Sequence, residues 1–427
     1  MKEKIVLIDG CRTPFLKAGT EFMDTMSYEL GQMAIQGLLS KTGIDKNEID
    51  SVILGTVIST LKTSNVAREA ALTAGIPNTT PCHTVTQACI SANRAIVSAI
   101  GELSTGQAEV VIAGGVDCSS DTPIGYKKKM RNKLFRSQKI KTFGDQLKFI
   151  ASLRIRDFLP ETPSITEFTT GKTMGQDCDI LAAKHGVSRK EQDVFAIQSH
   201  DLAQKAWDEG HMEKEVTAVQ VPPKFKYVNQ DNGIRAGSKI EKLSKLRPAF
   251  DKKHGTLTAA NSSFLTDGGA AVLLMTESKA KELGLQPKAE IIDYAFTGAD
   301  LNEELLLGPA FAISKALERS GLQLSDMDVI EIHEAFAGQV LANINCLGSD
   351  TFATERLNRT EKVGIVDMNK VNQWGGSLSI GHPFGATGAR LLNTTANRLH
   401  HEGGTYGILS ACAAGAHGHA MIIKKYQ

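Results

Sequence analysis

The chain has 427 residues, with 48 Lys plus Arg against 47 Asp plus Glu. This length predicts two or three globular units, and the balanced charge excludes a protein that binds nucleic acid through a global basic field. Seven cysteines without paired CxxC spacing predict reduced thiols in the cytoplasm, with no metal site, and no apolar run is long enough to span a bilayer.

Short β-rich runs alternate with longer helical patterns, which favours α/β layers that contain parallel strands. Strands are predicted at residues 5–8, 52–57, 110–113, 271–275, 289–294, 329–333, 406–410 and 420–423. Helices are predicted at residues 27–40, 90–100, 191–209, 310–318 and 386–400.

The order of these elements indicates an internal duplication. Residues 89–115 present a reactive side chain, a helix of small residues, a Gly turn and a buried strand, and residues 382–411 repeat that order. Cys89 and His382 are then expected at equivalent helix N-termini of two pseudo-symmetric halves, which meet at a shared interface. Helix N-termini favour negative charge, so this position predicts a lowered pKa for the Cys89 thiol.

The repeat leaves residues 121–254 unexplained. We therefore expect a first half at 1–120, completed by 255–277, an inserted loop domain at 121–254, and a second half at 278–427. The insertion begins with a basic stretch whose interleaved apolar residues predict an amphipathic helical hairpin. The basic residues are Lys127, Lys128, Lys129, Arg131, Lys133, Arg136, Lys139, Lys141, Lys148, Arg154 and Arg156.

Two motifs carry candidate residues for acyl transfer. Cys89 lies in VTQACISANRA, where small neighbours leave room for a substrate to approach a thiol nucleophile. His382 lies in GHPFGATGAR, where Pro383 fixes a turn and the glycines open the approach to a general base. The alternatives are a buried small hydrophobe for Cys89 and a turn histidine bonded to backbone for His382.

Two further residues extend this set. Cys412 ends an apolar strand, and its thiol can pass a proton to carbon if its site moves the pKa toward neutrality; the alternative is a core thiol. His333 opens HEAFAGQV directly after a strand, so it can hydrogen-bond a carbonyl oxygen; the alternative is a pair with Glu334 that caps the helix.

Taken together, these motifs resemble the thiolase family across essentially the whole chain. VTQACISANRA, GTLTAANSSFLTDGGAAVLL, HEAFAGQV with GHPFGATGAR, and the terminal CAAG block occur in the family's order. The basic insertion, and His333 where many thiolases have Asn, are most similar to the trifunctional-protein β subunits and their bacterial counterparts. One departure is Ala416 with His417, where the family usually has a further Gly, and this leaves the acyl chain-length preference open.

The resemblance implies a fold and a reaction. The fold is α/β, with two similar halves in a five-layered α-β-α-β-α arrangement and a loop domain. The reaction is cleavage of 3-ketoacyl-CoA by coenzyme A in fatty-acid β-oxidation, with coenzyme A as substrate and no permanently bound cofactor. Cys89 is expected to attack the 3-keto carbon after His382 takes its proton, and Cys412 to protonate the acetyl-CoA enolate.

The resemblance also implies which groups bind the acyl oxygen, the enolate oxygen and the substrate. The backbone N–H groups of Cys89 and Ala414 are expected to bind the acyl oxygen, and His333 with His382 the enolate oxygen. Ser263 and Met174 are expected to line the pantetheine channel.

The partners implied are a second copy, as a homodimer or dimer of dimers, and a hydratase/dehydrogenase α subunit. For the basic hairpin, membrane contact, docking of the α subunit and a solvated cover all stay open, and membrane contact would place the protein peripherally at the inner membrane. The alternative functions are acetoacetyl-CoA formation from two acetyl-CoA, and a non-catalytic scaffold or membrane-docking subunit.

Overall fold

Two groups of β-strands form the centre of the molecule in the computed structural model, which describes residues 3–163 and 166–427. They join only at a short antiparallel contact between β1 and β11, and each group mixes parallel with antiparallel pairs. The first group, in sheet order, is β1 (Ile5–Arg12), β10 (Thr266–Thr276), β5 (Val110–Asp117), β3 (Ser51–Gly55) and β4 (Cys82–Val85), with β2 (Leu16–Lys17) beside β10. The second is β11 (Ala289–Gly298), β14 (His417–Lys425), β13 (Tyr406–Ala413) and β12 (Met327–Ile332).

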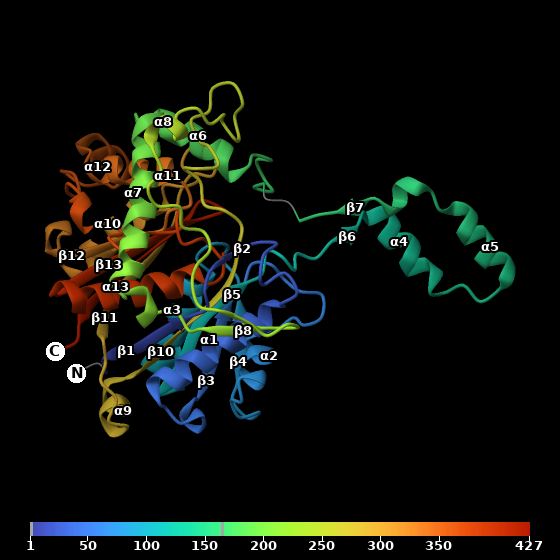
Figure 1. Cartoon of the computed structure of the whole chain (residues 1–427), viewed down its shortest axis with the longest axis horizontal. Helices are drawn as coiled ribbons and strands as arrows, with labels where there is room; N and C mark the ends of the chain where they lie inside the picture. Colours follow the sequence, from blue (N-terminus) through green and yellow to red (C-terminus); the bar gives the residue numbers. More distant parts are fainter. Residues whose placement is uncertain (1–2, 164–165) are drawn as a thin grey trace.

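Helices fill the space between the two groups of strands and cover their outer faces (Figure 1). The middle layer is α3 (Ser91–Ser104) and α13 (Thr387–Glu402), and α13 contacts strands of both groups. The outer layers are α1 (Ser27–Thr42) and α2 (Val66–Thr73) on the first group, and α10 (Gly308–Ser320) with α11 (Ala337–Leu347) on the second. This is the predicted five-layered α-β-α-β-α arrangement of two similar halves.

The two helices of the middle layer begin without a side-chain cap. Neither Ile90, the N-cap of α3, nor Ala386, the N-cap of α13, provides a side-chain hydrogen bond to its helix. By contrast, α6 (Met174–Lys184) and α7 (Arg189–Asp208) both begin with a capping box. Because side-chain caps satisfy free backbone N–H groups, their absence leaves donors available at the N-termini of α3 and α13.

The inserted segment has two parts with different surroundings. Its helices α6 and α7 pack against α11, and Cys178, Leu181 and Phe195 belong to the same apolar core cluster as the second half. Its other elements here are the strand pair β8 (Val219–Val221) and β9 (Lys226–Val228) and the short α8 (Ile240–Leu243). Much of the insertion therefore shares the core of the body.

The other part is a helical hairpin that projects from the body (Figure 1). Its helices are α4 (Lys128–Ser137) and α5 (Phe143–Ser152), and the strands β6 (Gly125–Tyr126) and β7 (Pro160–Glu161) pair at its base. The remaining elements of the body are α9 (Glu277–Glu282) and α12 (Asp350–Arg356). Within the described ranges, no helix is both long and apolar enough to cross a membrane.

Candidate active site

Cys89 lies in a tight turn immediately before α3. The preceding Ala88 has a φ of 46°, in the left-handed region that residues with a side chain rarely adopt. Ser91 holds this turn, because its Oγ donates to the Ala88 carbonyl at 2.7 Å and accepts from the Gln87 N–H at 2.7 Å. The turn presents Cys89 at the uncapped N-terminus of α3.

The pKa of Cys89 is raised to about 11, so the predicted lowering is wrong. Burial is the main cause, because it penalises the thiolate; hydrogen bonds from the backbone N–H groups of Ala414 and Cys89 lower the pKa, and the Asp117 carboxylate raises it. Desolvation outweighs the helix N-terminus here. Cys89 therefore rests as a neutral thiol at pH 7.

The turn that carries His382 is held by the first half of the chain. The His382 N–H donates to Thr266 Oγ1 at 3.0 Å, and the Gly385 N–H donates to the Asp117 carboxylate at 2.5 Å. Gly381 has a φ of 109°, which requires glycine. Since Asp117 also acts on the pKa of Cys89, one buried carboxylate adjoins both motifs.

Hydrogen bonds define which nitrogen of His382 carries the proton. The Thr387 hydroxyl donates to the Pro383 carbonyl at 3.0 Å and lies 2.6 Å from His382 Nδ1. A hydroxyl has a single hydrogen, so with that hydrogen on the Pro383 carbonyl Thr387 accepts from Nδ1–H, and Nε2 keeps its lone pair. Burial lowers the pKa of His382 to about 3, so the imidazole is neutral at pH 7 and suited to act as a base.

His333 lies directly after β12, stacked near His382. The two ring centroids are 4.0 Å apart, and neither Nε2 has a hydrogen-bond partner among the described residues. Burial, together with His382 and Arg390, keeps the pKa of His333 well below its usual range. Two neutral imidazoles therefore each leave one nitrogen free for a substrate.

Cys412 and Ala414 adjoin Cys89. Cys412 is fully buried near the end of β13, and burial followed by the neighbouring Cys89 raises its pKa well above the usual range. A shift of this pKa toward neutrality, which the sequence suggested, is therefore wrong. The Ala414 N–H points at the Cys89 sulfur, and the next N–H, that of Gly415, donates to Glu167 of the insertion at 2.9 Å.

The departures after CAAG also have a structural cost. Ala416 is buried and has a φ of 58°, and the ring of His417 lies beside Gly415. An L-residue in this conformation is strained, so the loop adopts the tight path that a glycine would allow at lower cost.

Glu334 supports the site from behind rather than capping a helix. Its fully buried carboxylate accepts from Ser199 Oγ and Asn372 Nδ2, both at 2.7 Å, and from the Leu378 N–H at 3.1 Å. Since Ser199 belongs to α7, these bonds fix the insertion to the second half of the chain.

A cavity of about 150 Å³ lies between the insertion and segment 255–268. Its lining includes His200, Arg235, Ser262 and Leu378, and it includes neither Ser263 nor Met174. The Ser263 N–H instead donates to the Ala335 carbonyl at 3.0 Å. Met174 packs against the core of the second half. The assignment of Ser263 and Met174 to the pantetheine channel stays a prediction.

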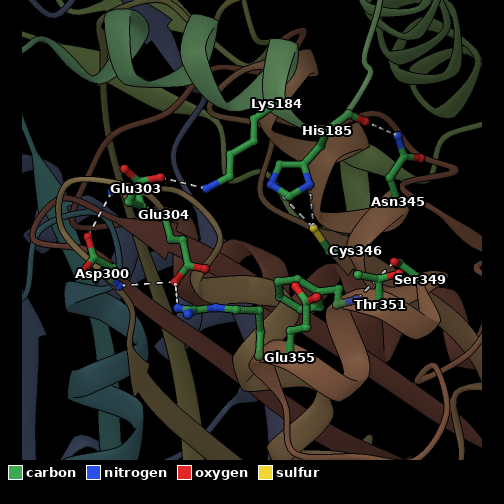
Figure 2. Close-up of a pocket in the computed structure, with 12 residues that line it drawn as sticks. Lys184, His185, Asp300, Glu303, Glu304, Asn345, Cys346, Ser349, Thr351 and Glu355 are labelled. Atoms are coloured by element: carbon green, nitrogen blue, oxygen red, sulfur yellow. Dashed lines mark hydrogen bonds and ion pairs between the residues drawn. The ribbon is translucent and has the colours of Figure 1, made fainter.

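A second cysteine–histidine pair lies in a surface cleft of about 550 Å³ (Figure 2). Cys346 Sγ is 3.3 Å from His185 Nδ1, and Lys184 pairs with Glu303 at 2.8 Å. Cys346 lies within α11, where its backbone N–H is used by the helix, and burial raises its pKa to about 12. This pair therefore has no backbone donors for an oxyanion. In the described residues, no three His, Cys, Asp or Glu side chains are grouped to hold a metal ion.

Sequence reasoning missed the residues that orient the two histidines. Thr387 lies within the GHPFGATGAR motif five residues after His382, so helical spacing was an available signal. Ser377 and Asp117 have no such signal, because only the folded chain brings them to His333 and to the Gly385 N–H.

A partly buried thiol with two backbone donors, a neutral imidazole base, a second thiol and a second imidazole define a thiol-dependent acyltransferase. Comparison with known proteins identifies the family. Residues 5–278 match the thiolase N-terminal domain and residues 285–425 the thiolase C-terminal domain. The chain belongs to the thiolase family.

Individual relatives cover nearly the whole chain. The mitochondrial trifunctional enzyme subunit beta of Bos taurus is 51% identical over 99% of this chain and 88% of its own length. The 3-ketoacyl-CoA thiolase of Shewanella sediminis is 44% identical over 99% of this chain and 97% of its own. The crystal structure of human mitochondrial 3-ketoacyl-CoA thiolase in complex with CoA superposes with a TM-score of 0.84 at 30% identity, covering 100% of this chain and 98% of that one.

Proposed function

We propose that this protein is an acetyl-CoA C-acyltransferase that cleaves 3-ketoacyl-CoA with coenzyme A in fatty-acid β-oxidation. The observation that carries the proposal is the Asp117 carboxylate, which acts on the Cys89 thiol and accepts from the Gly385 N–H in the turn of His382, whose ring packs against that of His333. In the first step, His382 takes the proton of Cys89 and the sulfur attacks the 3-keto carbon. The backbone N–H groups of Cys89 and Ala414 hold the resulting oxyanion.

The carbon–carbon bond then breaks, and its electron pair forms the enolate of acetyl-CoA. His333 and His382 face the enolate oxygen, and Cys412 gives its proton to the carbon so that acetyl-CoA leaves. Coenzyme A next gives its thiol proton to the Cys412 thiolate and attacks the acyl group on Cys89. The shortened acyl-CoA departs, and the imidazolium of His382 returns its proton to the Cys89 sulfur.

The pKa values of the two thiols suit this division of labour. Both pKa values are raised, but that of Cys412 is raised further, in part by Cys89 itself. The thiol with the lower pKa is deprotonated more readily and is the better leaving group, whereas the one with the higher pKa is the stronger base toward incoming coenzyme A.

The test is thiolysis of 3-ketoacyl-CoA substrates of increasing chain length, with Cys89→Ser as the inactive control. The proposal predicts turnover of substrates longer than four carbons. Activity confined to the four-carbon substrate would favour acetoacetyl-CoA formation instead. If intact mass spectrometry finds no acyl group on Cys89, a non-catalytic scaffold or membrane-docking subunit becomes the better reading.

The domain boundaries at 1–120 with 255–277, 121–254 and 278–427 remain part of this proposal. The two groups of strands support the two halves, and the projecting hairpin supports an insertion between them. Seven free cysteines support a reducing compartment such as the cytoplasm.

We further infer that a second copy pairs with the exposed edge of β4. β4 ends the sheet, and Cys82, Thr84 and Val85 on it are only partly buried. An unpaired edge strand offers backbone donors and acceptors to another chain. Light scattering of the purified protein should therefore report a homodimer or dimer of dimers, and Thr84→Pro, which removes a strand N–H, should shift it toward monomer.

The hairpin is assigned to an anionic membrane surface. Phe135, Phe143 and Ile150 expose 71%, 74% and 62% of their surface, although large apolar side chains are normally buried. Basic residues on α4 supply attraction to anionic lipid. Sedimentation with phosphatidylserine-containing vesicles should remove the protein from solution, and neutral vesicles should not. Equal recovery with both would favour the hairpin as the docking site of a hydratase/dehydrogenase α subunit, the partner suggested by relatives named subunit beta.

A further inference from the structure

A buried serine hydroxyl lies beneath His333. Ser377 is fully buried, and its Oγ lies 2.8 Å from His333 Nδ1. The same oxygen accepts a hydrogen bond from Arg390 Nη2 at 3.2 Å. The hydroxyl therefore has one contact with a group that only donates and one with a ring nitrogen that either donates or accepts.

The chemistry of these groups leaves one arrangement with every partner satisfied. A guanidinium cannot accept, so the Ser377 hydrogen must go to His333 Nδ1. If Nδ1 carried the proton instead, Ser377 would receive two donors and its own hydrogen would be buried without a partner, which is unfavourable. His333 thus has its lone pair at Nδ1 and its proton at the free Nε2.

This is the opposite tautomer from that of His382. There the Thr387 hydroxyl donates its hydrogen to the Pro383 carbonyl and accepts a hydrogen bond from Nδ1–H of His382. Two imidazoles with ring centroids 4.0 Å apart therefore present different groups, a lone pair at His382 Nε2 and an N–H at His333 Nε2.

The Arg390 guanidinium, which determines the tautomer of His333 through Ser377, is itself held in place. Arg390 lies 3.5 Å from the carboxylate of Glu331, which also accepts from Arg398 at 2.7 Å. All three side chains are buried, so the orientation of Arg390 toward Ser377 is set by packing as well as charge.

We propose that Ser377, oriented by Arg390, is a positioning residue that fixes His333 as an N–H donor to the enolate oxygen. The proposal rests on the proposed function and deepens it. With the other tautomer, a lone pair at Nε2 would face the negative oxygen and destabilise the enolate. The Ser377 hydroxyl thereby makes His333 the hydrogen-bond donor and leaves His382 as the base.

The first experiment reads the tautomer without any activity. The protein is labelled with ¹⁵N-histidine, and the ring signals that vanish in His333→Asn are assigned to His333. The wild type should show a protonated Nε2 and an unprotonated Nδ1, whereas Ser377→Ala should show a mixture or a reversal. A protonated Nδ1 in the wild type overturns the proposal, and this result leaves the proposed function standing.

The second experiment separates positioning from folding. Exchange of the α-protons of acetyl-CoA with D₂O requires the enolate, whereas acylation of Cys89 by a simple activated thioester does not. Loss of an oxyanion donor typically costs about 100- to 1000-fold. Because Ser377→Ala only lets the wrong tautomer form, it should lower exchange about 10- to 100-fold and change acylation less than about threefold.

His333→Asn supplies the matched background, because an amide donates without a choice of tautomer. Ser377→Ala should have little further effect on exchange in that background, less than about threefold by the logic of a double-mutant cycle. Equal losses in both backgrounds, or equal losses of exchange and acylation, would mean a structural role and overturn the proposal. If His333→Asn leaves too little exchange to measure, the nitrogen spectrum decides.

Discussion

His419 provides a test of how burial controls charge in the core beside the active site. It is fully buried on β14, stacks against Phe296 with centroids 4.7 Å apart, and has no hydrogen-bond partner on either ring nitrogen among the described residues. Burial, with Arg94 nearby, lowers its pKa to about 3 from an ordinary value of 6.5. Between those two pH values the unfolded chain binds one more proton than the folded protein, so stability falls as the pH falls.

The magnitude follows from the width of that window. Each pH unit below 6.5 costs about 1.4 kcal/mol, so at pH 5 His419 removes about 2 kcal/mol of unfolding free energy that is present at pH 7.5. Any folded pKa below about 4.5 gives nearly the same result at pH 5. His419→Leu removes the titrating group. The free energy of unfolding of this variant, relative to wild type, should therefore rise by about 2 kcal/mol between pH 7.5 and pH 5.

The assay is urea unfolding followed by circular dichroism at both pH values. Phe296→Leu is the matched control, because it truncates the stacking partner without removing a titrating group, and its difference from wild type should be the same at both. The reasoning is refuted if the difference for His419→Leu is also independent of pH, since His419 would then bind protons equally in the folded and unfolded states.

Three further predictions concern the site. Cys89→Ser should abolish the acyl-enzyme seen by intact mass spectrometry, whereas Cys412→Ala should keep slow acylation from activated thioesters and lose carbon–carbon cleavage; equal loss of both reactions in the Cys412 variant contradicts the assigned roles. Thr387→Val should lower kcat about tenfold or more with little change in KM, because His382 loses the acceptor at Nδ1. Gly385→Ala should lower both kcat and Tm, because its Cβ would lie 2.6 Å from the Gly55 carbonyl oxygen; an unchanged Tm argues against that close packing.

The body of the fold could be read from the sequence because its strands are continuous apolar runs. All eight predicted strands are present, and the predicted helices at 27–40 and 90–100 match α1 and α3 closely. β4 was missed because it lies at the edge of the sheet, where polar residues such as His83 and Thr84 replace the apolar run. The sequence pattern also could not predict whether neighbouring strands run parallel or antiparallel, since apolar runs look alike in both.

Sequence reasoning predicted less about the site, where pKa values depend on burial. Motifs predicted Cys89, His382 and His333 as site residues, and each lies at a junction between elements. The direction of the thiol pKa was wrong, because the sequence shows a helix N-terminus but not the depth at which the sulfur is buried. Desolvation acts over the whole surrounding shell of atoms, and that shell comes from both halves of the chain.

The neutral resting state has a consequence for the order of events in the reaction. With the pKa of Cys89 near 11 and that of His382 near 3, a thiolate–imidazolium pair is disfavoured before a substrate binds. In the proposed mechanism, charge is created only when a substrate carbonyl receives the electrons of the sulfur and places them under the Cys89 and Ala414 N–H groups. The two N–H groups therefore stabilise the oxyanion of the transition state rather than the free Cys89 thiolate. The same burial that raises both thiol pKa values thus makes ionisation of Cys89 depend on the substrate.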